Sequence, residues 1–183
     1  TLSLHDALPI FQEVIMFGFL KKKKNEQSVE NNFRLVSAVA GKSIPLSEVP
    51  DPVFAQKMAG DGIAIDTTGD TIVAPADGEL TLVFKTKHAF ALTLENGVEL
   101  LVHIGIETVG LEGEGFEQLV EQGTKVKAGT PIIKIDRELI KSKGLSLITP
   151  ILITNPDILG TITPVENIDT VAGETTVIEY TVK

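Results

Sequence analysis

The chain has 183 residues, 43% hydrophobic and 5% aromatic, which is enough for one substantial core and short for two. It contains no cysteine, which excludes a disulfide framework, a thiol nucleophile and a cysteine-based zinc site, and which agrees with a cytoplasmic location. A formal net charge of -9 argues against sequence-independent nucleic-acid binding and favours partners with basic surfaces.

The first 32 residues are expected to lie outside the folded domain. Residues 1–15 lack the basic start, apolar core and cleavage site of a signal peptide. Residues 1–10 resemble translated sequencing-adapter read-through, so we interpret residues 1–15 as a non-native leader. The alternative is a linker from an upstream permease domain. Residues 16–32 read as a flexible basic tail and linker, in which Met16 to Lys24 pairs an apolar stub with four lysines suited to an anionic membrane surface.

Short apolar runs separated by Gly, Pro, Asp and Asn recur over residues 33–183, which we assign to the folded domain. This pattern is typical of an all-β, antiparallel sandwich. Short helices are expected only at residues 116–122 and 137–143. The expected strands are residues 33–39, 63–65, 71–73, 79–84, 89–94, 98–104, 131–135, 146–154 and 176–182.

Two turn sequences repeat within the chain. Residues 126–129 (Val-Lys-Ala-Gly) and 170–173 (Thr-Val-Ala-Gly) each precede an apolar run. The repeat suggests two related halves of one sandwich, although a shared turn preference explains it equally well.

An Asn96-Gly97 step between two apolar runs predicts a β-hairpin. Two-residue type I′ turns need positive φ at both central residues, which Asn-Gly tolerates best. Such a turn would pair Glu95 with Val98.

This register would bring two histidines together. It places Phe90 opposite His103 and Gly105 opposite His88, so that both imidazoles point to one face with Cα atoms about 7–8 Å apart. Gly105 would leave space beside His88. A loop longer by one residue would put the two rings on opposite faces.

Period-two alternation would also place Phe84, Thr86, His88 and Phe90 on one strand face. Phe84 and Phe90 would then flank the histidine, and Thr86 could orient its ring. A lone histidine in an apolar strand is more often structural than functional. Two histidines on one face favour a site.

The segment 97–109 has a specific pattern: glycine, three apolar residues at 100–102, His103, an apolar residue, Gly105, an apolar residue, any residue, then Thr-Val. Together with the spacing to His88, residues 50–55 (Pro-Asp-Pro-Val-Phe-Ala) and residues 60–65 (Gly-Asp-Gly-Ile-Ala-Ile), it resembles the glucose-class enzyme IIA of the bacterial sugar phosphotransferase system. The resemblance covers about residues 33–183 and implies a compact all-β barrel-sandwich with short helical turns.

The resemblance implies a phosphotransferase component (EC 2.7.1 type) with a phosphohistidine intermediate and no required cofactor. His103 would accept a phosphoryl group on Nε2 from the histidine phosphocarrier protein and pass it to the enzyme IIB of a sugar permease, in sugar uptake and its regulation. Two adjacent imidazoles disfavour each other's positive charge, so both should be neutral at pH 7. Phosphorylation of His103 would favour protonation of His88, which could then donate a charge-assisted hydrogen bond. Thr86 and Gly105 would complete the phosphoryl site.

The resemblance also implies a docking surface around the histidines. Asp51 and Glu107 would form an acidic rim for a basic carrier. Taken singly, each apolar position is explained as well by a place in the core. Glu107 and Lys87 depart from the family, in which aspartate and asparagine are familiar. The apolar docking positions are Val53, Phe54, Met58, Phe84, Phe90 and Val109.

Two other classes of function stay open. A zinc-dependent hydrolase would need three protein ligands, and the sequence shows no His-x-His pair or acidic residue at ligand spacing. A weaker variant has His88 and His103 share zinc with a carboxylate of a bound partner. A regulatory module would use the same surface to engage transporters or enzymes according to its phosphorylation state.

Overall fold

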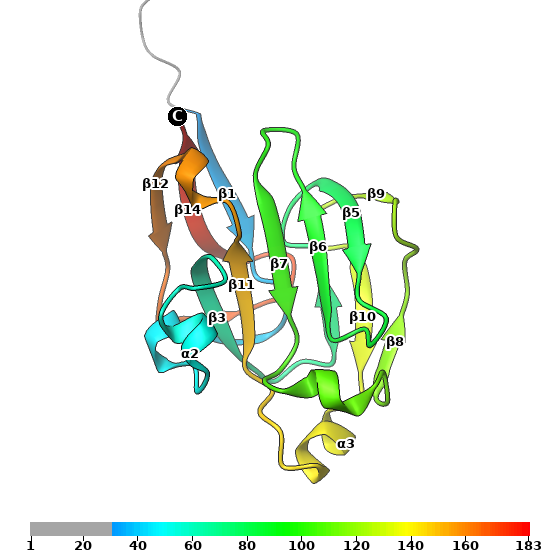
Figure 1. Cartoon of the computed structure of the whole chain (residues 1–183). Helices are drawn as coiled ribbons and strands as arrows, with labels where there is room; N and C mark the ends of the chain where they lie inside the picture. Colours follow the sequence, from blue (N-terminus) through cyan, green and yellow to red (C-terminus); the bar gives the residue numbers. More distant parts are fainter. Residues whose placement is uncertain (1–30) are drawn as a thin grey trace, which may run out of the picture. The chain divides into compact units, whose positions relative to one another are not determined.

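Antiparallel pairing organises the described part of the chain, residues 31–183 of this computed structural model, into three sheets (Figure 1). The compact unit runs from Asn32 to Lys183. The expected leader (1–15) and membrane-contact segment (16–24), and all of the expected tail up to residue 30, lie outside the described residues.

The largest sheet has eight strands and the other two have three each. The eight strands, in spatial order, are β13 (Asp169–Thr170), β2 (Gly41–Ile44), β3 (Asp61–Thr67), β11 (Thr149–Ile153), β7 (Glu99–His103), β6 (Ala89–Thr93), β5 (Gly78–Val83) and β9 (Lys125–Val126). The small sheets are β1 (Asn32–Val36), β14 (Thr176–Val182) and β12 (Leu159–Pro164), and β4 (Thr71–Val73), β10 (Pro131–Ile135) and β8 (Phe116–Gln118). The helical turns are η1 (Leu46–Glu48), α2 (Pro52–Ala55), η2 (Thr108–Leu111), α3 (Arg137–Ser142) and η3 (Pro156–Ile158).

The prediction of an all-β antiparallel sandwich with short helical turns is confirmed, and the sheets do not close into a barrel. The main core lies between the eight-stranded sheet and the two small sheets. It takes Ile151 and Ile153 from β11, Ile178 from β14 and Ile133 from β10. The intervening residue of β11, Leu152, points to the other face, as period-two alternation requires.

On that other face, a second apolar cluster is covered by the segment that holds η1 and α2. Leu46, Val49 and Phe54 of this segment pack on Ala64 of β3 and Leu152 of β11. The segment thereby shields the sheet next to the end of β7.

One expected helix is wrong and the other is confirmed. Residues 116–118 form β8, which pairs with β10. The apolar spacing of Phe116, Leu119 and Val120 imitates a helix, but pairing across the sheet overrides local preference. Helix α3 begins after Asp136, whose carboxylate accepts from the Leu139 N–H at 3.0 Å.

The repeated turn sequences hold equivalent places, which confirms the prediction of two related halves. Strand β9 pairs Val126 with Gly78, and β13 pairs Thr170 with Gly41 in the same way. Two further backbone bonds mirror each other: Val36 N–H donates to the Pro75 carbonyl at 2.9 Å, and Val73 N–H to the Ala38 carbonyl at 2.7 Å. The two turns end at Gly129 and Gly173, which pack against each other.

The ends of the described chain and the two histidines lie at opposite ends of the sandwich. In Figure 1, β1 starts and β14 ends at the upper end, beside the marked C-terminus, whereas β7 ends and β6 begins at the lower end. The described chain therefore enters and leaves at the end remote from His103.

Gly173→Ala should destabilise the fold more than Gly144→Ala. The two glycines have nearly the same φ, 74° and 73°, so each substitution carries the left-handed penalty of about 1–2 kcal/mol. A Cβ on Gly173 would lie 2.8 Å from the Gly129 Cα, whereas one on Gly144 meets nothing within 4 Å. We expect at least about 1 kcal/mol of additional loss for Gly173→Ala in urea unfolding. Equal losses would contradict the close packing of the two turns.

Candidate functional site

His88 and His103 meet where two neighbouring strands end. His103 is the last residue of β7, and His88 directly precedes β6. Their ring centroids are 5.0 Å apart and the rings are nearly perpendicular. The sequence prediction that these two imidazoles converge is confirmed.

The predicted hairpin register is wrong by one residue. Leu94, not Glu95, pairs with Val98, and Ala89, not Phe90, lies opposite His103. Within this loop only Gly97 has a positive φ, 85°, so the turn is not of type I′. The pairing of Leu94 with Val98 leaves three residues in the loop.

The rings meet because His88 lies outside the regular strand. The turn before it is closed by the Lys87 N–H, which donates to the Phe84 carbonyl at 2.8 Å, and Lys87 has a left-handed φ of 54°. Alternation along a strand would have turned His88 to the side of Phe90, which is fully buried in the main core. The expected role of Phe90, as a flank of the histidine and a docking residue, is therefore wrong.

His88 is held by the turn that precedes it. Its Nδ1 lies 2.6 Å from the Thr86 hydroxyl oxygen, and the Phe84 ring contacts it edge-on with centroids 5.3 Å apart. Only 5% of the residue is exposed. Burial, followed by the nearby His103, lowers the pKa of His88 to about 4 from its ordinary 6.5.

His103 is fixed in one tautomer by the backbone that follows it. Its Nδ1 lies 2.8 Å from the Gly105 carbonyl oxygen, which can only accept, so Nδ1 carries the proton. The other ring nitrogen, Nε2, is left with a free lone pair. Burial lowers the pKa of His103, while the bond to Gly105 and the Asp51 carboxylate oppose that shift.

Phe54 packs against the His103 ring, with centroids 4.9 Å apart. It lies on α2, which begins at Asp51, whose carboxylate accepts from the Val53 N–H at 2.8 Å. Phe54 is buried, so its predicted place on an exposed docking ring is wrong: it forms a wall of the histidine site.

The other predicted apolar docking residues are exposed. Met58 and Val109 are 70% and 53% exposed, and Val53 and Phe84 are exposed as well. We call these four residues, together with His88 and His103, the histidine face. Asp51 is half-buried at the start of α2, and Glu107 is exposed where η2 starts.

Sequence reasoning missed Thr108. It is fully buried, and its hydroxyl donates to the Ile104 carbonyl at 2.5 Å. The signal was present, because the matching pattern fixes a threonine five residues after His103.

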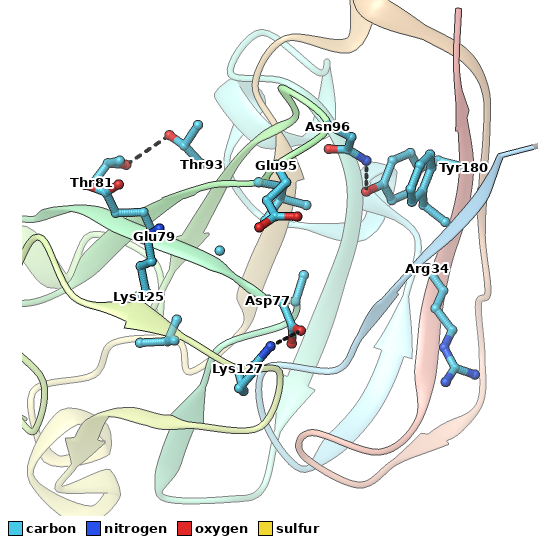
Figure 2. Close-up of a pocket in the computed structure, with 15 residues that line it drawn as sticks. Arg34, Asp77, Glu79, Thr81, Thr93, Glu95, Asn96, Lys125, Lys127 and Tyr180 are labelled. Atoms are coloured by element: carbon cyan, nitrogen blue, oxygen red, sulfur yellow. Dashed lines mark hydrogen bonds and ion pairs between the residues drawn. The ribbon is translucent and has the colours of Figure 1, made fainter.

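A groove among the described residues lies away from the histidines. It has a volume of about 930 Å³ and includes Arg34, Glu95 and the Asp77–Lys127 ion pair (Figure 2). Asn96 donates to the Tyr180 hydroxyl at its edge, at 3.0 Å. None of the predicted site residues lines it.

Within residues 31–183, no three His, Cys, Asp or Glu residues come close enough together to hold a metal ion. The zinc-hydrolase alternative therefore lacks its ligand set in the described part of the chain. Among the same residues, every helix is too short or too polar to span a membrane.

The family model of the phosphoenolpyruvate-dependent sugar phosphotransferase system, EIIA 1, matches residues 33–159. The chain belongs to the EIIA 1 family. EIIA 1 proteins are phosphotransferase components of this system, as the resemblance in the sequence implied. The match covers the whole histidine face.

Relatives of this EIIA chain agree with the assignment. It is 45% identical over 168 residues to the glucose-specific EIIA component of Bacillus anthracis, covering 92% of this chain and 98% of that protein. It is 54% identical over 132 residues to the glucose-specific EIIBCA component of Corynebacterium glutamicum, covering 72% of this chain and 20% of that protein. The solved structure of glucose permease IIA from Mycoplasma capricolum superposes with a TM-score of 0.75 at 37% identity, covering 81% of this chain and 96% of that one.

The stability of the protein should fall between about pH 6.5 and pH 4, partly through His88. In this window the unfolded His88 binds a proton that the folded one, with its pKa near 4, does not, so acid favours unfolding. His88→Gln removes this contribution. Urea unfolding at pH 7 and pH 5 should show a smaller acid loss in the variant than in the wild type. Identical losses of stability in the variant and the wild type would mean that the pKa of His88 is not lowered in the folded protein.

Asp51→Asn should lower the pKa of His103 further. Asparagine caps helices as well as aspartate does, so the variant keeps α2 and removes only the negative charge. NMR titration of the His103 ring protons measures the shift. An unchanged or raised midpoint would contradict the electrostatic coupling.

Proposed function

We propose that this EIIA chain carries a phosphoryl group on Nε2 of His103 during sugar uptake. The observation that carries the proposal is the bond from Nδ1–H of His103 to the Gly105 carbonyl, at 2.8 Å. It leaves Nε2 as the nucleophile in a ring that the depressed pKa keeps neutral at pH 7.

The transfer is an in-line displacement between two histidines. The Nε2 lone pair attacks phosphorus, the bond from phosphorus to the donor's ring nitrogen breaks, and that nitrogen keeps the electron pair. In such transfers positioning and charge stabilisation supply most of the catalysis. The chemistry needs no cofactor.

His88 and Gly105 are placed to stabilise the transferred group. With the Thr86 hydroxyl donating to Nδ1, the proton of His88 is on Nε2, and the His88 ring lies edge-on against that of His103. The added negative charge favours protonation of His88, which could then donate a charge-assisted hydrogen bond to a phosphoryl oxygen. The Gly105 N–H, which donates to no partner among the described residues, is a further donor for a phosphoryl oxygen.

The donor is the histidine phosphocarrier protein and the acceptor is an enzyme IIB. Fusion of EIIA with EIIB and EIIC in the Corynebacterium glutamicum relative supports the second partner. The histidine face offers exposed apolar side chains beside Asp51 and Glu107, which suits partners with an apolar centre and a basic rim. The same face would serve a regulatory partner, and a cytoplasmic location stays a prediction.

A zinc ion shared with a partner remains a proposal of its own. The Nδ1 atoms of both histidines are engaged, by Thr86 and by Gly105, so their Nε2 atoms are the available ligands, that of His88 in the tautomer in which Nδ1 donates to the Thr86 hydroxyl. Two nitrogens do not complete a tetrahedral site, so a partner carboxylate would have to supply a third ligand.

His103→Gln should abolish phosphorylation, whereas His88→Gln should accept the group and pass it on poorly. The first variant lacks the nucleophile, and the second lacks the donor that stabilises the transferred group. The measurement incubates the full chain with phosphoenolpyruvate, enzyme I and the phosphocarrier protein and follows an acid-labile, base-stable phosphoryl group. Onward transfer is read by adding enzyme IIB.

Labelling of His103→Gln at another histidine would overturn the assignment of His103. Absence of labelling in the folded wild type, with donors that label a known EIIA, would overturn the phosphocarrier function itself.

A further inference from the structure

Thr108 is a fully buried polar residue that the proposed chemistry does not use. It is the first residue of η2, and its Oγ1 donates to the Ile104 carbonyl at 2.5 Å. The hydroxyl therefore fixes the plane of the peptide between Ile104 and Gly105.

The peptides on either side of it contact the two histidines. The Ile104 N–H donates to the His88 carbonyl at 2.7 Å, and the Gly105 carbonyl accepts from Nδ1 of His103 at 2.8 Å. A rotation of the Ile104–Gly105 peptide would change the spacing between the backbones of His88 and His103. It would also change the direction of the Gly105 carbonyl, which sets the tautomer of His103.

The backbone at Gly105 does not fix itself. Its φ is 75°, in a region where glycine moves freely because it has no Cβ. External contacts restrain it instead, and the peptide that carries the Gly105 carbonyl is also held by the Ile106 N–H, which donates to the Ser146 carbonyl at 3.0 Å. A Cβ on Gly105 would lie 2.6 Å from the Thr108 methyl carbon and 2.7 Å from the Ser146 carbonyl oxygen, so both pack closely on it.

We propose that Thr108 is a positioning residue for His103: by holding the Ile104–Gly105 peptide, it aims the Gly105 carbonyl at Nδ1 and keeps Nε2 free. This inference rests on the proposed role of His103. Thr108 touches neither the phosphoryl group nor the His103 ring nitrogen and acts only through the backbone.

Three variants separate positioning from stability. Thr108→Val removes the hydroxyl and keeps the shape, and Thr108→Ser keeps the hydroxyl. Thr170→Val is the matched control, because Thr170 is also buried and donates to a backbone carbonyl, that of Val39 at 3.1 Å. It lies in β13, four strands away from β7 in the sheet.

Two readouts are needed. Long-range ¹H–¹⁵N spectra of the unphosphorylated protein report which nitrogen of His103 carries the proton. The initial rate of phosphoryl transfer from the labelled phosphocarrier protein reports the consequence. Urea unfolding of each variant confirms that it is folded under the conditions of both.

Thr108→Val should show a mixture of His103 tautomers and a transfer rate reduced by at least about tenfold. Thr108→Ser should restore the wild-type spectrum and rate, and Thr170→Val should lose stability without changing either. A wild-type spectrum in Thr108→Val, or slow transfer in Thr170→Val, would overturn the inference. Because the spectrum needs no donor, it decides the role of Thr108 even if the wild type fails to accept phosphate, an outcome that overturns only the proposed function.

Discussion

The last rung of the β6–β7 ladder is the constraint on which the site depends. Here the Ile104 N–H donates to the His88 carbonyl, one residue beyond the regular pairing of Ala89 with His103. Both histidines thus sit where a rigid sheet gives way to turns. The sheet fixes how far apart their backbones are, and the turns are free to aim the two rings at each other. Neither a strand interior nor a loop alone would do both.

Desolvation gives this arrangement its chemical character. Each imidazole is packed against an aromatic ring, Phe84 for His88 and Phe54 for His103. Burial depresses both pKa values, so the site holds two neutral rings rather than two cations. A neutral histidine can act as a nucleophile, and it does not repel the positive charge of a basic partner. The apolar walls therefore serve the reaction before any partner covers them.

Much of the fold followed from the sequence because its signals are local. Alternating apolar runs and turn residues located most of the strands, and the helix expected at residues 137–143 is α3. The hairpin register could not be read this way. Asn96-Gly97 is compatible with loops of two or three residues. In the three-residue loop Asn96 accepts from the Val98 N–H and donates to the hydroxyl of Tyr180, which is remote in sequence.

The two histidines were brought together correctly although the assumed register was wrong. The left-handed turn at Lys87 reverses the side to which His88 points, and nothing in the local pattern marks a lysine for that conformation. Burial was equally hard to foresee. Phe54 and Phe84 look alike in sequence, yet only Phe84 remains exposed, because Phe54 belongs to the segment that packs on the sheet and is itself part of the second apolar cluster.

The placement of the chain ends has a consequence for assembly. Strand β1 begins and β14 ends at the end of the sandwich remote from the histidine face (Figure 1). A polypeptide joined at Asn32 is therefore attached at the end of the sandwich opposite the histidine face. In an arrangement such as the EIIBCA relative, that tether raises the local concentration of the domain around its neighbours without occupying the contact surface. The same sandwich is therefore compatible with a separate EIIA chain and with a fused one, because the junction leaves the histidine face uncovered.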